Sequence, residues 1–169
     1  MKKEADLFYE VFESPLGPLW MVSGREGLSY LLWHRSESGM RAEIQSRAGR
    51  LPQKQTRHTA SWRADLKRYF SGQEVLFRGE IAFLEGTSFQ QAVWRSLLHI
   101  PYGQVTSYRS IADQINKPGA SRAVGNACGK NPLPIVVPCH RVLRQDGRLG
   151  GYTGGVEIKT RLLKIEGVL

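Results

Sequence analysis

Three short runs of apolar and β-branched residues near the start of the chain predict strands. They span Leu7 to Phe12, Leu19 to Val22 and Leu28 to Trp33, and they are rich in the residue types that strands favour. Residues 14–18 and 23–27 lie between them and carry the Gly, Pro and Ser of turns. Consecutive strands joined by short turns usually pair, so the first third of the chain is predicted to form a small antiparallel sheet.

The pattern then changes to a helical period. Residues 35–58 are polar and basic, which favours a helix followed by a loop. Residues 61–70 carry four bulky apolar or aromatic side chains at helical spacing and are followed by Ser-Gly, which predicts a second helix. Residues 73–87 are expected to form a connector with a short strand, and we place a domain boundary near Glu85.

The second half of the chain has helical spacing and helix-capping residues. Ser88 is expected to cap one helix, and Thr106 or Ser107 is expected to cap another. A tight turn at residues 116–119 then leads into a short helix over residues 120–129. Two helices joined by a short turn with Gly form a helix-turn-helix, which is suited to placing its second helix in a DNA groove.

The helix predicted over residues 120–129 lacks bulky side chains. It holds three alanines and two glycines, which make it a weak helix former. So thin a helix suits close approach to another backbone or entry into the minor groove of DNA, which is about 6 Å wide. Arg122 is the long cation on this surface.

These elements predict an α+β chain with two domains. Residues 1–84 are expected to form an N-terminal domain of antiparallel sheet plus helix. Residues 85–169 are expected to form a mainly helical C-terminal domain that contains the helix-turn-helix and ends on a helix at about residues 157–166. With 169 residues and 41% hydrophobic content, the chain is long enough to bury the cores of two small domains.

The charge of the chain points to a polyanionic partner. The formal net charge is +9. Residues 1–84 hold 13 Lys and Arg against 10 Asp and Glu, whereas residues 85–169 hold 11 against 5. An excess concentrated in one domain favours nucleic acid, although a merely soluble basic surface would give the same total.

The composition favours a cytoplasmic protein. No apolar run approaches the 18 residues of a membrane span, so no membrane partner is expected. The charged start of the chain lacks the apolar stretch and cleavage site of a signal peptide. Two cysteines make no disulfide framework, and we expect them to stay reduced.

The candidate chemistry lies at Cys139 and His140. A thiol is a nucleophile as thiolate, and nearby cations favour that form. The apolar run over residues 135–137 predicts extended backbone, in which neighbouring side chains point to opposite faces, so a water between thiol and imidazole is the easier arrangement. His140 also needs an orienting acceptor. Spacing alone does not choose among the acidic residues of this half, which are Glu85, Asp113, Asp146, Glu157 and Glu166.

Several ordered motifs resemble the O6-alkylguanine-DNA alkyltransferases. They are Arg-Ala-Val-Gly-Asn-Ala at residues 122–127, Asn-Pro at 131–132, Pro-Cys-His-Arg-Val at 138–142 and Gly-Tyr-Thr-Gly-Gly at 151–155. Residues 100–108 are similar to the stretch that opens the helix-turn-helix in that family. The match runs from about Ser88 to Gly167. Residues 1–84 match loosely, and the resemblance implies a ribonuclease-H-like supporting domain there.

The resemblance implies direct DNA repair. The protein would bind duplex DNA through the minor groove, flip out O6-alkylguanine, or O4-alkylthymine by the same route, and move the alkyl group to Cys139. The thioether product has no labile bond, so each molecule would act once. The resemblance implies no cofactor. We expect a monomer, and the sequence leaves cooperativity on DNA open.

The resemblance also assigns roles by position. Cys139 would accept the alkyl group, His140 would act through water as its base, and Glu166 would orient His140. Tyr108 would donate to the guanine ring N3, and Asn131 would link the recognition helix to the active-site segment.

Other positions would face the DNA or the flipped base. Arg122 would fill the gap that the base leaves, Tyr152 would wall the pocket, and the Thr153 amide would face O6. The carbonyls of Val142 and Cys139 would meet the exocyclic amine. The further positions expected at the DNA or the base are Ser121, Ala123, Gly125 and Cys128.

The chain departs from the family pattern in ways that matter for function. Cys128 stands where an apolar residue is expected, and it is either a small buried hydrophobe or a second alkyl acceptor. Gly129 replaces a basic residue of some members, which weakens phosphate contact. The zinc-binding cysteines and the cysteine-rich regulatory domain of some relatives are absent, so we expect no metal and no role as a transcription factor. His34, His58 and His99 have no second ligand at metal spacing.

Two other classes of protein explain part of the pattern. A sequence-specific DNA-binding regulator accounts for the charge and the helix pair, but not for the Cys-His segment or the glycine-rich run. A thiol hydrolase accounts for Cys139 and His140, but it needs an oxyanion hole and no DNA surface.

Overall fold

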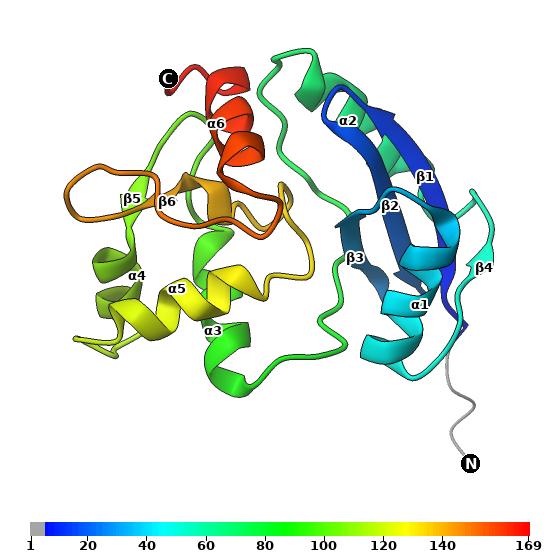
Figure 1. Cartoon of the computed structure of the whole chain (residues 1–169), viewed down its shortest axis with the longest axis horizontal. Helices are drawn as coiled ribbons and strands as arrows, with labels where there is room; N and C mark the ends of the chain where they lie inside the picture. The colour runs from blue at the N-terminus through cyan, green and yellow to red at the C-terminus, as the bar shows by residue number, and fades with distance from the viewer. Residues whose placement is uncertain (1–5) are drawn as a thin grey trace. The chain divides into compact units, whose positions relative to one another are not determined.

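The computed structural model describes residues 6–169, which divide into two compact units (Figure 1). One unit holds residues 6–71 and 75–85, and the other holds residues 72–74 and 86–169. None of the helices in the described part of the chain combines the length and apolar character that crossing a bilayer requires.

The first unit is built on a four-stranded sheet in the order β3-β2-β1-β4. The antiparallel meander of β1 (Phe8–Ser14), β2 (Gly17–Gly24) and β3 (Gly27–Trp33) confirms the three predicted strands. The short β4 (Gln53–Lys54) pairs parallel to β1, so the sheet is mixed and includes a parallel pair that the sequence patterns did not indicate. Two polar, exposed residues carry no alternation by which the sequence could reveal such a strand.

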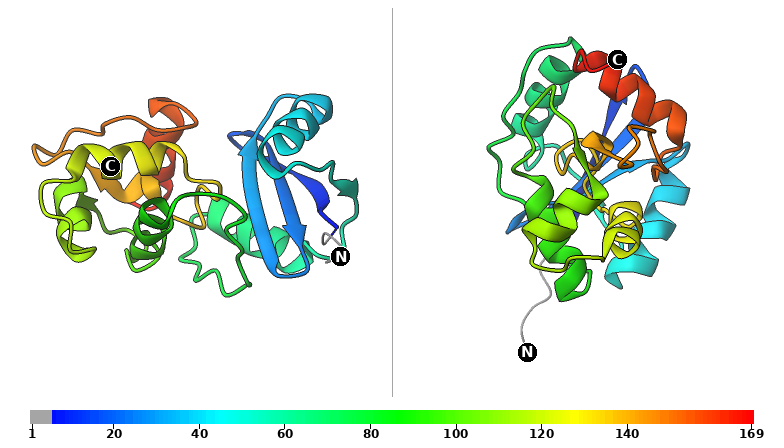
Figure 2. Two further views of the ribbon diagram at one scale, coloured as in Figure 1. Left: turned by 90° about the horizontal axis from the view of Figure 1, so that it is seen from below. Right: turned by 90° about the vertical axis from the view of Figure 1, so that its left-hand side faces the viewer.

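Two helices cover the two faces of this sheet (Figure 2). α1 (Glu37–Ala48) buries Met40 and Ile44 in a cluster with side chains of β1, β2 and β3. α2 (Ala60–Phe70) lies on the other face, where Phe12 of β1 stacks on Phe70 at 5.9 Å between ring centroids. Because neighbouring strand residues point to opposite faces, the meander buries both of its sides.

The second unit is mainly helical, as predicted. It contains α3 (Ser88–Leu97), α4 (Tyr108–Gln114), α5 (Ser121–Gly129) and α6 (Val156–Ile165). Two short strands, β5 (Thr106–Ser107) and β6 (Val142–Leu143), pair in parallel, which the sequence patterns did not indicate. This pairing places the start of α4 beside the segment that follows the Cys-His pair.

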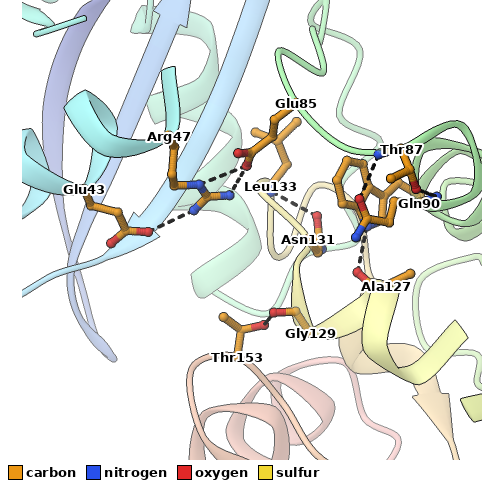
Figure 3. A network of polar contacts seen from close by, with 11 residues as sticks. Glu43, Arg47, Glu85, Thr87, Gln90, Ala127, Gly129, Asn131, Leu133 and Thr153 are labelled. Carbon is orange, nitrogen blue, oxygen red and sulfur yellow. Dashed lines mark hydrogen bonds and ion pairs between the residues drawn. The ribbon is translucent and has the colours of Figure 1, made fainter. Parts of the chain in front are cut away.

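The helix caps refine two sequence predictions. The cap of α3 is Thr87 and not Ser88, because Thr87 and Gln90 form a reciprocal capping box that leaves Ser88 as the first helical residue (Figure 3). Of the two residues proposed to cap α4, Ser107 does so, and its hydroxyl accepts from the Ser110 amide at 3.1 Å.

The predicted helix-turn-helix is formed by α4 and α5. Asn116 and Gly119 take positive φ angles of 56° and 85° in the turn between them. The indole Nε1 of Trp94 on α3 donates to the carbonyl of Ala127 at 2.8 Å, which holds α5 from behind. Since α5 has little apolar bulk of its own, this buried hydrogen bond helps to fix its position.

Candidate active site

The segment before Cys139 is a series of tight buried turns, so the expectation of an extended strand was wrong. Every residue from 131 to 142 is buried. The chain then forms a 3-10 turn, η1 (Cys139–Arg141), in which the Arg141 amide donates to the carbonyl of Pro138 at 3.0 Å. Prolines at 132, 134 and 138 remove the donors that strand pairing needs, which overrides the β-branched composition.

One residue in this segment has an uncommon backbone conformation. Ile135 has a φ of 74°, in the left-handed region that β-branched residues rarely enter. It is only 1% exposed, and the packing around it offsets the strain. Backbone strain of this kind often lies beside functional groups, and here it precedes Cys139 by four residues.

The side chain of Asn131 connects the two ends of the buried segment. Its Nδ2 donates to the carbonyl of Val137 at 2.8 Å and to the Sγ of Cys139 at 3.1 Å. Its Oδ1 accepts from the Leu133 amide at 2.9 Å (Figure 3). Asn131 lies two residues beyond the end of α5, so it ties the recognition helix of the helix-turn-helix to the sulfur.

The structure pairs His140 with Glu166, at the end of α6. The distance from His140 Nε2 to Glu166 Oε1 is 2.6 Å, and both side chains are inaccessible to solvent. Arg141 makes two further bonds to this carboxylate, from Nε at 2.8 Å and from Nη2 at 3.0 Å. Arg141, whose role no sequence pattern indicated, therefore provides the charge that a buried carboxylate requires.

The protonation of this pair follows from its contacts. Burial alone would raise the pKa of Glu166, but the hydrogen bonds from His140 and Arg141 outweigh it and lower that pKa to about 2. An ionised carboxylate only accepts, so Nε2 of His140 carries the proton and Nδ1 keeps its lone pair. Burial lowers the pKa of His140 in spite of the nearby carboxylate, and the imidazole is neutral at pH 7.

Cys139 is a protonated thiol at rest. It is 3% exposed, and this burial raises its pKa to about 11, although the Asn131 hydrogen bond and the charge of Lys159 act in the opposite direction. The nearby cation therefore does not by itself produce a thiolate. A base must remove the proton before the sulfur can attack.

Lys159 is a buried cation that the sequence analysis missed. Its side chain is 0% exposed, and Nζ donates to the carbonyls of Val142, at 2.7 Å, and Leu149. Nζ also lies 5.8 Å from the ring centroid of Tyr108. The signal was its spacing: Lys159 precedes Leu162 and Leu163 by three and four residues, which places it on the apolar stripe of α6.

A cavity of about 690 Å³ opens next to Tyr108. Its walls come from α4, α5 and the loop between β6 and α6. The predicted site residues that line it are Tyr108, Ser121, Arg122, Gly125, Tyr152 and Thr153. Val142 and Cys128 are buried and Ala123 is exposed, and none of the three lines this cavity.

A hydrogen bond closes one side of the cavity, and burial sets the protonation of Tyr108. The Thr153 hydroxyl donates to the carbonyl of Gly129 at 2.9 Å, which joins the glycine-rich loop to the end of α5 (Figure 3). Burial, with smaller effects from Cys128 and Cys139, raises the pKa of Tyr108 to about 12. The phenol is therefore protonated at pH 7 and able to donate a hydrogen bond.

Comparison with known proteins agrees with the sequence motifs and this geometry. A family profile described as the DNA-binding domain of 6-O-methylguanine DNA methyltransferase matches residues 88–168. A methylated-DNA–protein-cysteine methyltransferase of Methanosarcina acetivorans is 40% identical over 161 residues, which cover 95% of this chain and 99% of the relative. The chain belongs to the methylated-DNA–protein-cysteine methyltransferase family.

Solved members of the family share the fold. The crystal structure of Mycobacterium tuberculosis O6-methylguanine methyltransferase has a TM-score of 0.82 at 39% identity, covering 95% of this chain and 92% of that one. That of Mycobacterium tuberculosis OGT in complex with DNA has a TM-score of 0.81 at 41% identity, covering 94% and 92%. The resemblance and the α+β fold class predicted from the sequence are confirmed.

Proposed function

We propose that the protein repairs duplex DNA by moving the alkyl group of O6-alkylguanine to Cys139, once per molecule. The observation that carries this proposal is the buried arrangement of Asn131, Cys139, His140 and Glu166. In it, Asn131 Nδ2 lies 3.1 Å from the sulfur and His140 lies 2.6 Å from Glu166. Family membership supports the same chemistry.

The first step is removal of the thiol proton. The lone pair of His140 that can accept a proton is on Nδ1, because Nε2 donates to Glu166. His140 accepts the proton of Cys139 through a water molecule, and Glu166 then faces an imidazolium. Arg141 holds the carboxylate in place throughout, while Lys159 and the Asn131 amide stabilise the thiolate.

The second step is an in-line displacement at the alkyl carbon. A bond forms between sulfur and carbon as the bond between carbon and O6 breaks, and the electron pair stays with the guanine. Tyr108 donates its proton to the ring N3 and regains one from His140 through solvent. In sum, the thiol proton ends on guanine, which leaves as a neutral base, and Cys139 becomes a thioether.

Burial of the sulfur requires the target nucleotide to leave the stack. Cys139 is 3% exposed, so a base inside a duplex does not reach it. Ser121, Arg122 and Gly125 line the cavity from α5, whose small side chains let it approach the DNA closely. Arg122 is the side chain long enough to take the place of the flipped base.

The carbonyls expected to recognise the base have room for a further donor. The carbonyl of Val142 accepts from Lys159 Nζ, and that of Cys139 accepts from the Val142 amide. Each carbonyl oxygen has two lone pairs, so one remains for the exocyclic amine of guanine. O4-alkylthymine also carries its alkyl group on an exocyclic oxygen that can leave, and it is proposed as a second substrate. We also propose that the protein acts as a monomer.

Mass spectrometry tests the proposal. The protein is incubated with excess duplex that contains O6-methylguanine and is then digested. We expect a gain of one methylene on the peptide with Cys139 and one turnover per molecule. Cys128→Ala, which removes the other cysteine of the chain, should keep the transfer, whereas Cys139→Ala should abolish it and leave DNA affinity within a few fold. An unmodified Cys139, or a methyl group on Cys128 alone, would refute the assignment.

A further inference from the structure

The cavity next to Tyr108 holds more positive charge than a neutral base requires. Arg109, Arg122 and Arg144 all line it, and none of its lining residues is Asp or Glu. The proposed function uses Arg122 in the DNA stack. Two guanidinium groups, those of Arg109 and Arg144, therefore line the cavity with no role in the reaction.

Arg144 is held at the cavity by its own turn. Its amide donates to the carbonyl of Arg148 at 2.8 Å, and its carbonyl accepts from the Gly147 amide at 2.9 Å. Its stem passes over Gly150, where a Cβ atom would lie 3.5 Å from Arg144 Cγ and 2.9 Å from Tyr108 Oη. The start of the Arg144 side chain is thus packed near the Tyr108 hydroxyl, and Arg109 follows Tyr108 directly on α4.

The two arginines have no acidic partner in the part of the chain that the structure describes. Within residues 6–169, neither side chain forms an ion pair with a carboxylate. The one acid in the turn, Asp146, is bound instead by Arg148, with Nε 2.6 Å from Oδ2. Repulsion between unmatched cations around one cavity is relieved when an anion enters it.

We propose that Arg109 and Arg144 bind a backbone phosphate beside the flipped nucleotide, an inference that rests on the proposed function. A nucleotide that enters this cavity brings its phosphodiester to the rim, and a guanidinium fork matches two phosphate oxygens. α5 ends at Gly129 and has Arg122 as its cation, so α4 and the loop between β6 and α6 supply the further charge that phosphate binding needs.

Salt dependence of binding measures this contact. Arg109→Gln and Arg144→Gln are compared with Arg161→Gln, a control on an exposed position of α6 outside the cavity. Each lost phosphate contact should reduce the magnitude of the slope of log affinity against log salt by about 0.9. If variant and wild type bind equally well at about 1 M salt, the variant should then bind roughly eightfold more weakly than the wild type at about 0.1 M salt. The control should change the slope much less, and an equal change in all three variants would overturn the proposal.

A neutral backbone separates phosphate binding from other effects. Replacing the phosphates on either side of the lesion with methylphosphonates should weaken DNA binding by the wild type. On that DNA, Arg144→Gln should bind with nearly the same affinity as the wild type. If the loss caused by Arg144→Gln persists in full on that DNA, or appears only with anionic alkyl groups, the phosphate assignment is wrong. Transfer from free O6-benzylguanine should fall much less in the variants than transfer from DNA, and equal losses would also overturn the proposal. A wild-type protein that fails to react with either substrate would instead refute the proposed function.

Discussion

At the level of single residues, the site combines a sulfur that burial keeps protonated with an imidazole that burial keeps neutral. The pKa of Cys139 is raised to about 11 and that of His140 is lowered. Neither group carries charge at pH 7, so the pair becomes reactive only when a proton moves from one to the other. Under the proposed function, the thiol is a poor nucleophile toward solvent electrophiles until a base removes its proton.

The pH dependence of transfer should expose this arrangement. In His140→Gln, which lacks the base, the reaction depends on thiolate formed by the solution. Because pH 7 to 10 lies below the Cys139 pKa of about 11, the rate should rise about tenfold per pH unit over that range. Single-turnover transfer from free O6-benzylguanine measures it, and the wild-type profile should be flatter. A variant rate independent of pH would mean that the thiol is already ionised at rest.

At the level of elements, α5 provides a narrow helix surface, and Arg122 provides the long side chain on it. The helix has two glycines and small side chains, and Arg122 lines the cavity from its first turn. Under the proposed function, in which Arg122 takes the place of the flipped base, Arg122→Ala should slow repair in duplex DNA by on the order of tenfold to a hundredfold, since flipping costs a few kcal/mol and an inserted side chain offsets part of it.

Reaction with free base is the comparison that isolates flipping. Free O6-benzylguanine needs no eversion, so Arg122→Ala should slow that reaction far less. Arg95→Ala, on the exposed side of α3, serves as a control for loss of positive charge. Equal losses on DNA and on free base would contradict a role for Arg122 in flipping.

The loop between β6 and α6 holds the Tyr108 hydroxyl by close contact at Gly150. Gly150 has a φ of 68°, and a Cβ there would lie 2.9 Å from Tyr108 Oη. Gly150→Ala should cost roughly 1–2 kcal/mol in backbone strain and displace the hydroxyl, which slows transfer from DNA and free base alike. Thermal unfolding and single-turnover rates measure both effects. Gly151→Ala is the matched control, because no atom beyond its chain neighbours lies within 4 Å of its Cβ position. A Gly150→Ala variant with the same stability and transfer rate as Gly151→Ala would contradict this contact.

At the scale of the whole molecule, stability depends on the buried side-chain carboxylate of Glu166. The pKa of Glu166 is about 2 in the folded protein against an ordinary value of 4.5. Its contribution to stability is therefore fully present above pH 4.5 and is lost as the pH falls toward 2. A difference of that size corresponds to about 3 kcal/mol.

Urea unfolding at pH 7, 5 and 3 measures this contribution. Glu166→Gln should be less stable than the wild type at pH 7, because it leaves Arg141 buried without its charge partner. The difference between the two proteins should shrink as the pH falls below 4.5. Parallel curves over that range would show that the carboxylate is not held in its ionised form.

Local patterns predicted the elements whose own sequence stabilises them. The three meander strands and the helices at residues 60–70 and 156–165 follow from apolar spacing and turn residues. The patterns failed for β4, β5 and β6, which are two residues long and form only because a partner strand lies alongside. They also failed before Cys139, where prolines and the Asn131 side chain override the preference of Ile135 and its neighbours for extended backbone.

The sequence by itself determined the family, the candidate pair Cys139-His140, and the helix-turn-helix with its thin second helix. The family resemblance named Glu166 as the partner of His140, but only the tertiary structure shows the two side chains 2.6 Å apart across 26 residues of sequence. Only the structure shows that Lys159, 17 residues from Val142, is buried beside the site. It also decided that Cys139 is protonated at rest and that Arg144 lies by Tyr108. The reason is physical: spacing and composition act along the chain, whereas burial, charge pairing and pKa values are set by neighbours that the fold brings together.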